Sequence, residues 1–293
     1  MKALHSVFVF FLQLIIDLIV WAPNRFLGLT ASFMAFFYRY YAVKECRQLE
    51  ENIDKVLGLP RHSSFAKDFA NQVVYHQFRS SFESLKVIWG RKKITIDGVA
   101  EYKAVLDQAT GIGKGVIIAT AHIGSWELLS KVTAECLTDS RLVVLAKPAR
   151  QRFVTILLEQ LRERAGVGVL WLSSKSLLKD MLRTLSEKNA LGFVMDQKPK
   201  GRVGTEIYFY GHSAEFVRGP AQLSCKHNTP VVSAFCLRVA PMHYKIVLSD
   251  TLEGFSLDQE DELTNALVQN IEKIVRMYPE QWCWNYKRWK FAK

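Results

Sequence analysis

From residue 94 onward, short apolar runs alternate with amphipathic segments of helical period, and this alternation restricts the fold more than any other feature of the sequence. We expect strands at 94–96, 116–121, 141–146, 166–172, 190–195, 207–210, 230–239 and 244–249. We expect helices between them at 99–109, 126–136, 153–164, 173–187, 219–227 and 259–278. The pattern predicts an α/β fold with a mixed, largely parallel sheet that helices cover on both faces.

Three polar residues follow the apolar runs at the point where each expected strand ends: His122, Lys147 and Asp196. The carboxyl ends of parallel strands meet at one edge of the sheet, and ligands bind at that edge in open α/β folds. The sequence therefore predicts that these side chains lie together.

The segment 121–127 (AHIGSWE) crosses from an expected strand into an expected helix. With His122 in the turn and Glu127 in the first helical turn, the imidazole can fold back onto the carboxylate. Such a pair forms a general base, in which the carboxylate fixes the tautomer and the other ring nitrogen takes a proton from a hydroxyl. The alternative is a lone histidine at a strand end and a solvated glutamate near a helix N-terminus. Ser125 either caps this helix or points into the site.

The first 42 residues are unusually apolar, with one run at 7–22 and a second at 26–41 on either side of Pro23. We expect a membrane-anchor helix, a hinge at Pro23, and a second helix lying at the membrane interface. Basic residues follow the first run more than they precede it, which predicts that the body of the protein faces the cytoplasm. The expected division is an anchor region, 1–42, and a catalytic domain, 43–293. The alternative is a pair of ordinary buried helices.

The net charge of +11 suits an anionic membrane, an acidic protein or a phosphorylated substrate. Nucleic acid is disfavoured as a partner, because the sequence has neither a zinc-finger pattern, an RNA-binding aromatic signature nor a long basic tail. Five cysteines without a C-x-x-C pair indicate reduced thiols in a cytosolic compartment and do not indicate a metal site.

Four segments spread in order over nearly the whole chain resemble the late acyltransferases of lipid A biosynthesis, the lauroyl and myristoyl transferases of the lysophospholipid acyltransferase-like superfamily. They are 121–127, which matches the family's His-x4-Glu motif, 195–197 (MDQ), 208–211 (YFYG) and 279–290 (PEQWCWNYKRWK). The apolar N-terminus is similar as well.

The resemblance implies an inner-membrane enzyme that transfers a fatty acyl chain from acyl carrier protein to a hydroxyl of a glycolipid, without a metal or nucleotide cofactor. It implies that His122 is the general base and Glu127 its orienting partner. It also places Arg164 near the site, with Arg162 as a close competitor, and Asp196 at the site's edge.

The chain departs from the family pattern after Asp196. The loop 198–202 (KPKGR) is strongly basic, and its Lys198 and Lys200 either bind acceptor phosphates or the acidic carrier protein, or form a solvated surface loop. Related enzymes that acylate phosphatidylinositol mannosides share the core motifs, so the acceptor stays open.

Two other functions are alternatives: a non-catalytic membrane lipid-binding protein, and a thioesterase or lipase, which the absence of a G-x-S-x-G motif disfavours. In the C-terminal segment, we expect Trp282 and Trp284 to pack in the core and Trp289 to lie at the membrane interface.

Overall fold

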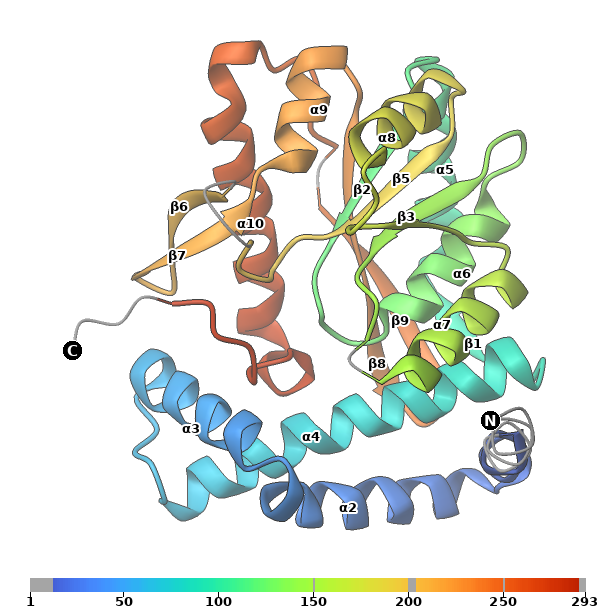
Figure 1. The fold of residues 1–293 in the computed structure, drawn as a ribbon. Coiled ribbons are helices and arrows are strands. Elements are labelled where there is room, and N and C mark those ends of the chain that lie inside the picture. Colours follow the sequence, from blue (N-terminus) through green and yellow to red (C-terminus); the bar gives the residue numbers. More distant parts are fainter. Residues whose placement is uncertain (1–12, 150, 200–203, 250, 290–293) are drawn as a thin grey trace.

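The computed structural model describes residues 13–149, 151–199, 204–249 and 251–289, and within them a seven-stranded sheet forms the centre of the molecule (Figure 1). The strand order is β1-β9-β8-β2-β5-β3-β4, and in this described sheet only β8 and β9 pair antiparallel. The strands are β1 (Thr95–Asp97), β2 (Val116–Thr120), β3 (Leu142–Ala146), β4 (Gly168–Trp171), β5 (Ala190–Val194), β8 (Val231–Ala240) and β9 (His243–Leu248). The predicted mixed, largely parallel sheet is confirmed.

Helices cover both faces of this sheet because its central strands are apolar on both sides. Alternate residues of β2 enter different cores: Val116 and Ile118 pack with one buried cluster, and Ile117 and Ala119 with the other. The first face carries α5 (Val99–Gly111), α6 (Trp126–Cys136) and α7 (Arg152–Arg164). The second carries α8 (Leu177–Ser186), α9 (Gly219–His227) and α10 (Glu260–Met277).

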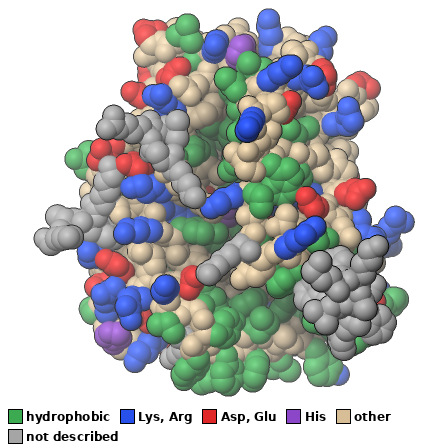
Figure 2. All heavy atoms as spheres, in the orientation of Figure 1, with side chains coloured by type: hydrophobic (Ala, Val, Ile, Leu, Met, Phe, Trp, Pro, Cys, Tyr) green, Lys and Arg blue, Asp and Glu red, His purple; other side chains and the backbone are tan. Residues whose placement is uncertain are grey.

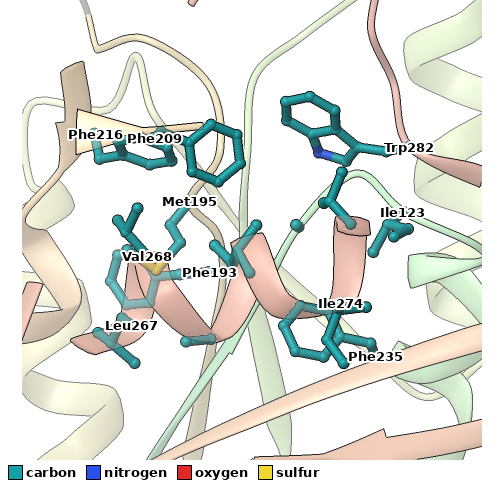
Figure 3. Close-up of a cluster of buried hydrophobic side chains, with 14 of the residues drawn as sticks. Ile123, Phe193, Met195, Phe209, Phe216, Phe235, Leu267, Val268, Ile274 and Trp282 are labelled. Carbon is teal, nitrogen blue, oxygen red and sulfur yellow. The ribbon is translucent and has the colours of Figure 1, made fainter. Parts of the chain in front are cut away.

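A separate antiparallel hairpin, β6 (Gly204–Phe209) and β7 (His212–Val217), packs beside α10. Its β7 strand was not predicted, because the sequence pattern indicated a strand only at 207–210. Figure 3 shows Phe209 and Phe216 of the hairpin above Met195 and Val268, so the hairpin closes the core over α10.

The N-terminal part forms a layer of helices below the sheet in Figure 1: α2 (Asn24–Tyr41), α3 (Val43–Leu57) and α4 (Ser64–Ser84), which continues into a short π-helical turn, Leu85–Trp89. The described residues 13–21 are also helical, and this helix ends just before Pro23 as predicted. Leu27 and Ala31 of α2 pack against Phe82 of α4, which fixes α2 to the body of the protein.

The expected membrane-spanning anchor is not supported. None of the helices in the described residues is both long and apolar enough to span a bilayer. The first part of the expected anchor, residues 7–12, lies outside the described residues.

The α2 helix is nonetheless apolar on two sides. Its outer side carries a stripe of exposed apolar and aromatic residues at helical spacing: Phe26, Leu29, Phe33, Phe36 and Tyr40. Figure 2 shows hydrophobic side chains gathered at the lower end of the molecule, where Figure 1 places α2. We call these five residues the α2 stripe.

Candidate active site

The loop between β2 and α6 is held by backbone contacts that require a glycine. Gly124 has a φ of +59°, and a Cβ atom there would lie 2.1 Å from the carbonyl oxygen of Cys236. Only glycine tolerates both this conformation and this approach. The Gly124 N–H donates to the backbone carbonyl of Gln281 (3.1 Å), and the Ser125 N–H donates to the backbone carbonyl of Cys236 (2.8 Å). The loop is therefore clamped between β8 and the C-terminal segment.

Ser125 caps the helix that follows this loop. Its buried Oγ accepts from the Leu128 N–H (3.3 Å) and shares a hydrogen bond with the Ser84 hydroxyl (2.8 Å). The cap starts α6 immediately after the loop and leaves His122 as the side chain that emerges from the end of β2.

His122 pairs with Asp196 from the neighbouring strand. Asp196 follows β5, which runs parallel to β2, with Thr120 and Val194 in register at the strand ends. The Nδ1 atom of His122 lies 2.6 Å from Oδ1 of Asp196. The prediction that strand-end polar residues meet at one edge is confirmed for this pair, although the family resemblance implied for Asp196 only a position at the edge of the site.

The C-terminal segment supplies two more partners to the Asp196 carboxylate. Trp282 Nε1 donates to Oδ2 (2.8 Å), the guanidinium of Arg288 donates to the same oxygen (3.0 Å), and Arg288 Nε donates to the Asp196 carbonyl (2.6 Å). The Asp196 side chain is fully buried and that of Arg288 is 1% exposed. We call His122, Asp196, Trp282 and Arg288 the Asp196 cluster.

These contacts keep Asp196 ionised in the interior. Burial alone would raise the pKa of its carboxyl, but the charges of His122 and Arg288 and the hydrogen bonds from His122 and Trp282 lower that pKa well below its usual range. Burial in turn lowers the pKa of Arg288, and the charge of Asp196 acts in the opposite direction by raising it.

The ionised carboxylate determines the tautomer of His122. A carboxylate only accepts hydrogen bonds, so Nδ1 must carry the proton that it shares with Asp196. When the ring is neutral, its lone pair lies on Nε2, and the side-chain nitrogen of Gln197 is 3.2 Å from this atom, where it can donate. His122 is 15% exposed, so its Nε2 is ready to accept a proton from a molecule that displaces Gln197.

The expected hydrogen bond between Glu127 and His122 is wrong. Glu127, on the first turn of α6, forms a two-pronged ion pair with Arg162 of α7, with N–O distances of 2.6 and 3.2 Å. The reason is geometric, because the Asp196 carboxylate from the adjacent strand already holds Nδ1. Glu127 still lines the same cavity as His122, as does Arg162.

The contacts of Arg164 and Arg162 show which of these two arginines lines the cavity. Arg164 stacks on the ring of Trp89, with its guanidinium carbon 4.2 Å from the ring centroid, whereas Arg162 is the one that binds Glu127. Lys198 forms an ion pair with Glu215 (3.1 Å), and Lys200 lies outside the described residues. Lys147 lines the cavity beside His122, as its strand-end position predicted.

A cavity of about 640 Å³ runs from His122 between the sheet and helices α6 and α7. At one end it is bordered by polar side chains, including Gln197, Tyr286 and the Glu127–Arg162 pair. Its interior is lined mainly by aliphatic side chains from β2, β3, α6 and α7. Within the described residues, no group of His, Cys, Asp and Glu side chains is arranged to hold a metal ion. The cavity thus joins a proton acceptor to an apolar chamber, an arrangement suited to a substrate with a reactive polar head and a hydrocarbon tail.

The sequence of the whole chain agrees with this chemistry. Residues 1–291 match the model of the bacterial lipid A biosynthesis acyltransferases. The chain belongs to this acyltransferase family.

Similar proteins within and around this acyltransferase family differ in their acceptors. Over 252 residues, 83% of this chain and 76% of the relative, the chain is 25% identical to the phosphatidylinositol mannoside acyltransferase of Mycobacterium tuberculosis. Over 203 residues, 68% of this chain and 62% of the relative, it is 22% identical to the lipid A biosynthesis palmitoleoyltransferase of Escherichia coli K12. A lipid A biosynthesis acyltransferase of Shigella flexneri matches to the same extent.

Several residues of this acyltransferase site were not assigned a place there by the sequence. Arg288 and Trp282 stand within the C-terminal motif, and Gln197 follows Asp196 in the second motif, so their signal was the motif match itself. Tyr286 lines the cavity with its ring centroid 5.3 Å from that of His122, and burial raises its pKa. Trp289 was expected at the membrane interface but is buried beside Phe209, to whose carbonyl its Nε1 donates.

Proposed function

We propose that this acyltransferase moves a fatty acyl chain from acyl carrier protein to a hydroxyl group of a lipid A precursor, the secondary acylation of lipopolysaccharide biosynthesis. The observation that carries the proposal is His122, whose Nδ1 is held by Asp196 and whose side chain lines a largely apolar cavity.

His122 acts as the general base. The acceptor hydroxyl takes the place of Gln197 at Nε2 and gives up its proton there, while its oxygen attacks the carbonyl carbon of the acyl thioester. The tetrahedral intermediate collapses by breaking the C–S bond. The leaving thiolate takes the proton back from Nε2, so the ring returns to its starting form. Asp196 stabilises the imidazolium throughout, because its negative charge lies 2.6 Å from Nδ1.

Gln197 and the Glu127–Arg162 pair have supporting roles in this proposal. The Gln197 amide, displaced from Nε2 by the hydroxyl, donates a hydrogen bond to the oxyanion. Glu127 does not orient His122 directly; it holds the Arg162 guanidinium at the cavity wall, where that cation faces the reacting groups. Arg164 supports α7 from outside the cavity through Trp89.

The acyl chain occupies the apolar part of the cavity, and the polar heads of donor and acceptor meet at its entrance. Lys198 and Lys200, in the basic loop after Gln197, are placed to meet acceptor phosphates or the acidic carrier protein. Neither a metal ion nor a nucleotide takes part in this scheme. The similarity to a phosphatidylinositol mannoside acyltransferase favours a second candidate acceptor, another glycolipid of that kind.

The α2 stripe supports a location at the cytoplasmic face of the bacterial inner membrane. Five exposed apolar side chains lie on one helix face, and contiguous exposed apolar patches mark sites of protein or membrane interaction. Exposed basic residues lie at both ends of the stripe, Arg25 in the first turn of α2 and Lys44 and Arg47 in α3, and they suit an anionic leaflet. In this proposal α2 lies in the interface plane, and the acceptor lipid reaches the cavity from the same membrane.

The decisive experiment is an acyl-transfer assay with purified protein, an acylated carrier protein and a lipid A precursor, read by mass spectrometry of the lipid. Acyl-CoA replaces the carrier protein in a second arm, and a phosphatidylinositol mannoside replaces the acceptor in a third. We expect transfer from the carrier protein that His122→Ala abolishes. Wild-type activity in His122→Ala would refute the mechanism, and transfer only to the mannoside would reassign the acceptor.

The membrane location is tested by flotation with anionic phospholipid vesicles. Phe33→Ser interrupts the α2 stripe and is expected to reduce vesicle binding. Leu178→Ser, a similarly exposed apolar residue on α8 (62% against 64% for Phe33), is the control and is expected to bind as the wild type does. Equal vesicle binding by both variants would show that α2 does not lie at the membrane interface.

A further inference from the structure

The wall of the cavity that the sheet contributes is built in rows across three neighbouring parallel strands. Most of the lining residues of β2, β5 and β3 are two positions apart, because successive side chains of a strand point to opposite faces; Phe193 and Leu145 also line the cavity, from the intervening positions. The outer row, nearest His122, consists of Thr120, Val194 and Ala146. Each further row lies about 7 Å deeper, which is the rise of two strand residues.

The second row differs from the first in having no side chain at its centre. Ile118 of β2 and Val144 of β3 are both in register with Gly192 of β5, which lies between them. The three residues line the cavity together. With no side chain on Gly192, the cavity reaches the strand backbone in this row, and Leu142, the next residue of β3 on this face, lines the cavity as well.

The glycine is not required by the backbone here. Gly192 lies within an extended strand and is not among the glycines with positive φ. An added Cβ would point onto this same wall, 3.0 Å from Cγ1 of Val144 and 3.5 Å from Cδ1 of Leu142. A glycine in a strand interior costs stability, so its presence calls for a reason in what it makes room for. Gly192 itself lines the cavity, so we take that reason to be cavity space: an added Cβ would crowd Val144 and Leu142, which line the cavity with it.

We infer that Gly192 sets the length of the acyl chain that this enzyme accepts, by keeping the second row open so that the chain reaches Leu142. This inference rests on the proposed acyl transfer and assigns the part of the cavity that holds the terminal methylene groups. A side chain at position 192 ends the cavity after the outer row, and a smaller side chain at 142 deepens it.

The test is a competition among decanoyl, lauroyl, myristoyl and palmitoyl carrier proteins in one reaction, with the product lipids resolved by mass. Gly192→Ala is expected to shift the products to shorter chains, raising the ratio of the shorter to the longer product about tenfold relative to wild type, as expected when a hydrophobic pocket loses room for methylene groups. Leu142→Ala is expected to shift the products the opposite way.

The matched control is Gly168→Ala on the adjoining strand β4. This glycine is in register with Val143, whose side chain faces away from the cavity, and an added Cβ would lie 3.3 Å from Cγ2 of that valine. Its products should match the wild type. If Gly192→Ala does not fold, as judged by circular dichroism, Leu142→Ala carries the test alone. Wild-type product lengths in the folded variants would overturn the inference.

Failure of the proposed function is distinguished by a binding readout. If the wild type transfers no chain from any donor, the acyltransferase proposal fails on its own. Displacement of a fluorescent fatty acid by free fatty acids of the same four lengths then still measures the cavity. Loss of palmitate and myristate binding in Gly192→Ala, with decanoate binding unchanged, supports the role of this residue, and unchanged binding of all four overturns it.

Discussion

Two carboxylates stand at the same edge of the sheet and are held in opposite ways. Asp196 is fully buried and accepts hydrogen bonds from His122, Trp282 and Arg288, whereas Glu127 is 13% exposed and binds only one described partner, Arg162. The first carboxylate is fixed by two segments of the chain, the loop after β2 and the C-terminal segment, and the second by one neighbouring helix. In the proposed mechanism, this difference separates a group that orients the base from a group that positions a cation at the cavity wall.

The comparison also shows that closeness along the chain does not identify a partner. Glu127 follows His122 by five residues and shares its motif, yet the carboxylate at the imidazole comes from 74 residues away. A turn followed by a capped helix directs Glu127 towards α7, while the parallel neighbour β5 delivers Asp196 directly beside the end of β2.

The largest expected effect is that of Asp196→Asn. The amide keeps the shape but can no longer stabilise the imidazolium, so kcat should fall by about 10³–10⁴, as when an orienting carboxylate is replaced in a catalytic triad. The measurement is steady-state acyl transfer. Glu127→Gln, the same change in the other carboxylate, is the matched comparison and should cost less; the reverse order would assign the orienting role to Glu127.

The next effect, about tenfold to a hundredfold, is expected for the Glu127–Arg162 pair, because a displaced group at the cavity wall misaligns the reacting atoms. A double-mutant cycle with Glu127→Gln and Arg162→Gln should show that the second change adds little to the first. Arg164→Gln, two residues along the same helix, is the control and should retain nearly full kcat. Additive losses would mean that the two residues act separately.

Acid unfolding distinguishes the Asp196 cluster from a second titrating residue, His76. Burial and the charge of Arg238 lower the pKa of His76 to about 4, so the unfolded chain binds a proton near pH 6.5 that the folded protein does not. The free energy of unfolding should therefore decline as the pH falls from about 6.5 to about 4. Asp196, whose pKa is lowered, should contribute only to the loss below about pH 4.

Urea unfolding between pH 7 and pH 3 measures both windows. In His76→Gln, the decline of the unfolding free energy between about pH 6.5 and pH 4 should disappear, and the decline below about pH 4 should remain. In Asp196→Asn, the first decline should remain and the second should be reduced. An unaltered upper window in His76→Gln would exclude this histidine as its source.

The smallest effect is expected for Lys198→Gln. Its ion pair with Glu215 is partly exposed, and such pairs contribute about 0–1 kcal/mol to stability. If the basic loop meets the carrier protein, KM for the acylated carrier should rise a few-fold with kcat unchanged. Lys226→Gln, on the distant helix α9, should leave both parameters unchanged. A fall in kcat instead would place Lys198 in the reaction itself.

The sequence predicted the sheet well because β2, β5 and β3 are almost wholly apolar runs, each followed closely by a polar residue. It also located His122, Lys147 and Asp196 at one edge, since parallel strands impose that arrangement. Two features escaped it. The strand β7 pairs only with β6, and its short polar-apolar alternation was not distinguished from a loop. The partner of His122 depends on which strands become neighbours in the sheet. The periodicity of apolar residues locates the strands along the chain but does not reveal their order in the sheet.

The contact between Arg288 and Asp196 determines when, during synthesis of the chain, this site can form. Asp196 is translated 92 residues before Arg288, whose guanidinium compensates its buried charge. A nascent chain that has not emerged past Arg288 therefore holds a costly unpaired carboxylate at the end of β5, and the catalytic arrangement has no stable form until that segment folds back. Premature termination before this residue would leave Asp196 without the guanidinium that compensates its charge, so under the proposed mechanism a chain truncated there should be inactive.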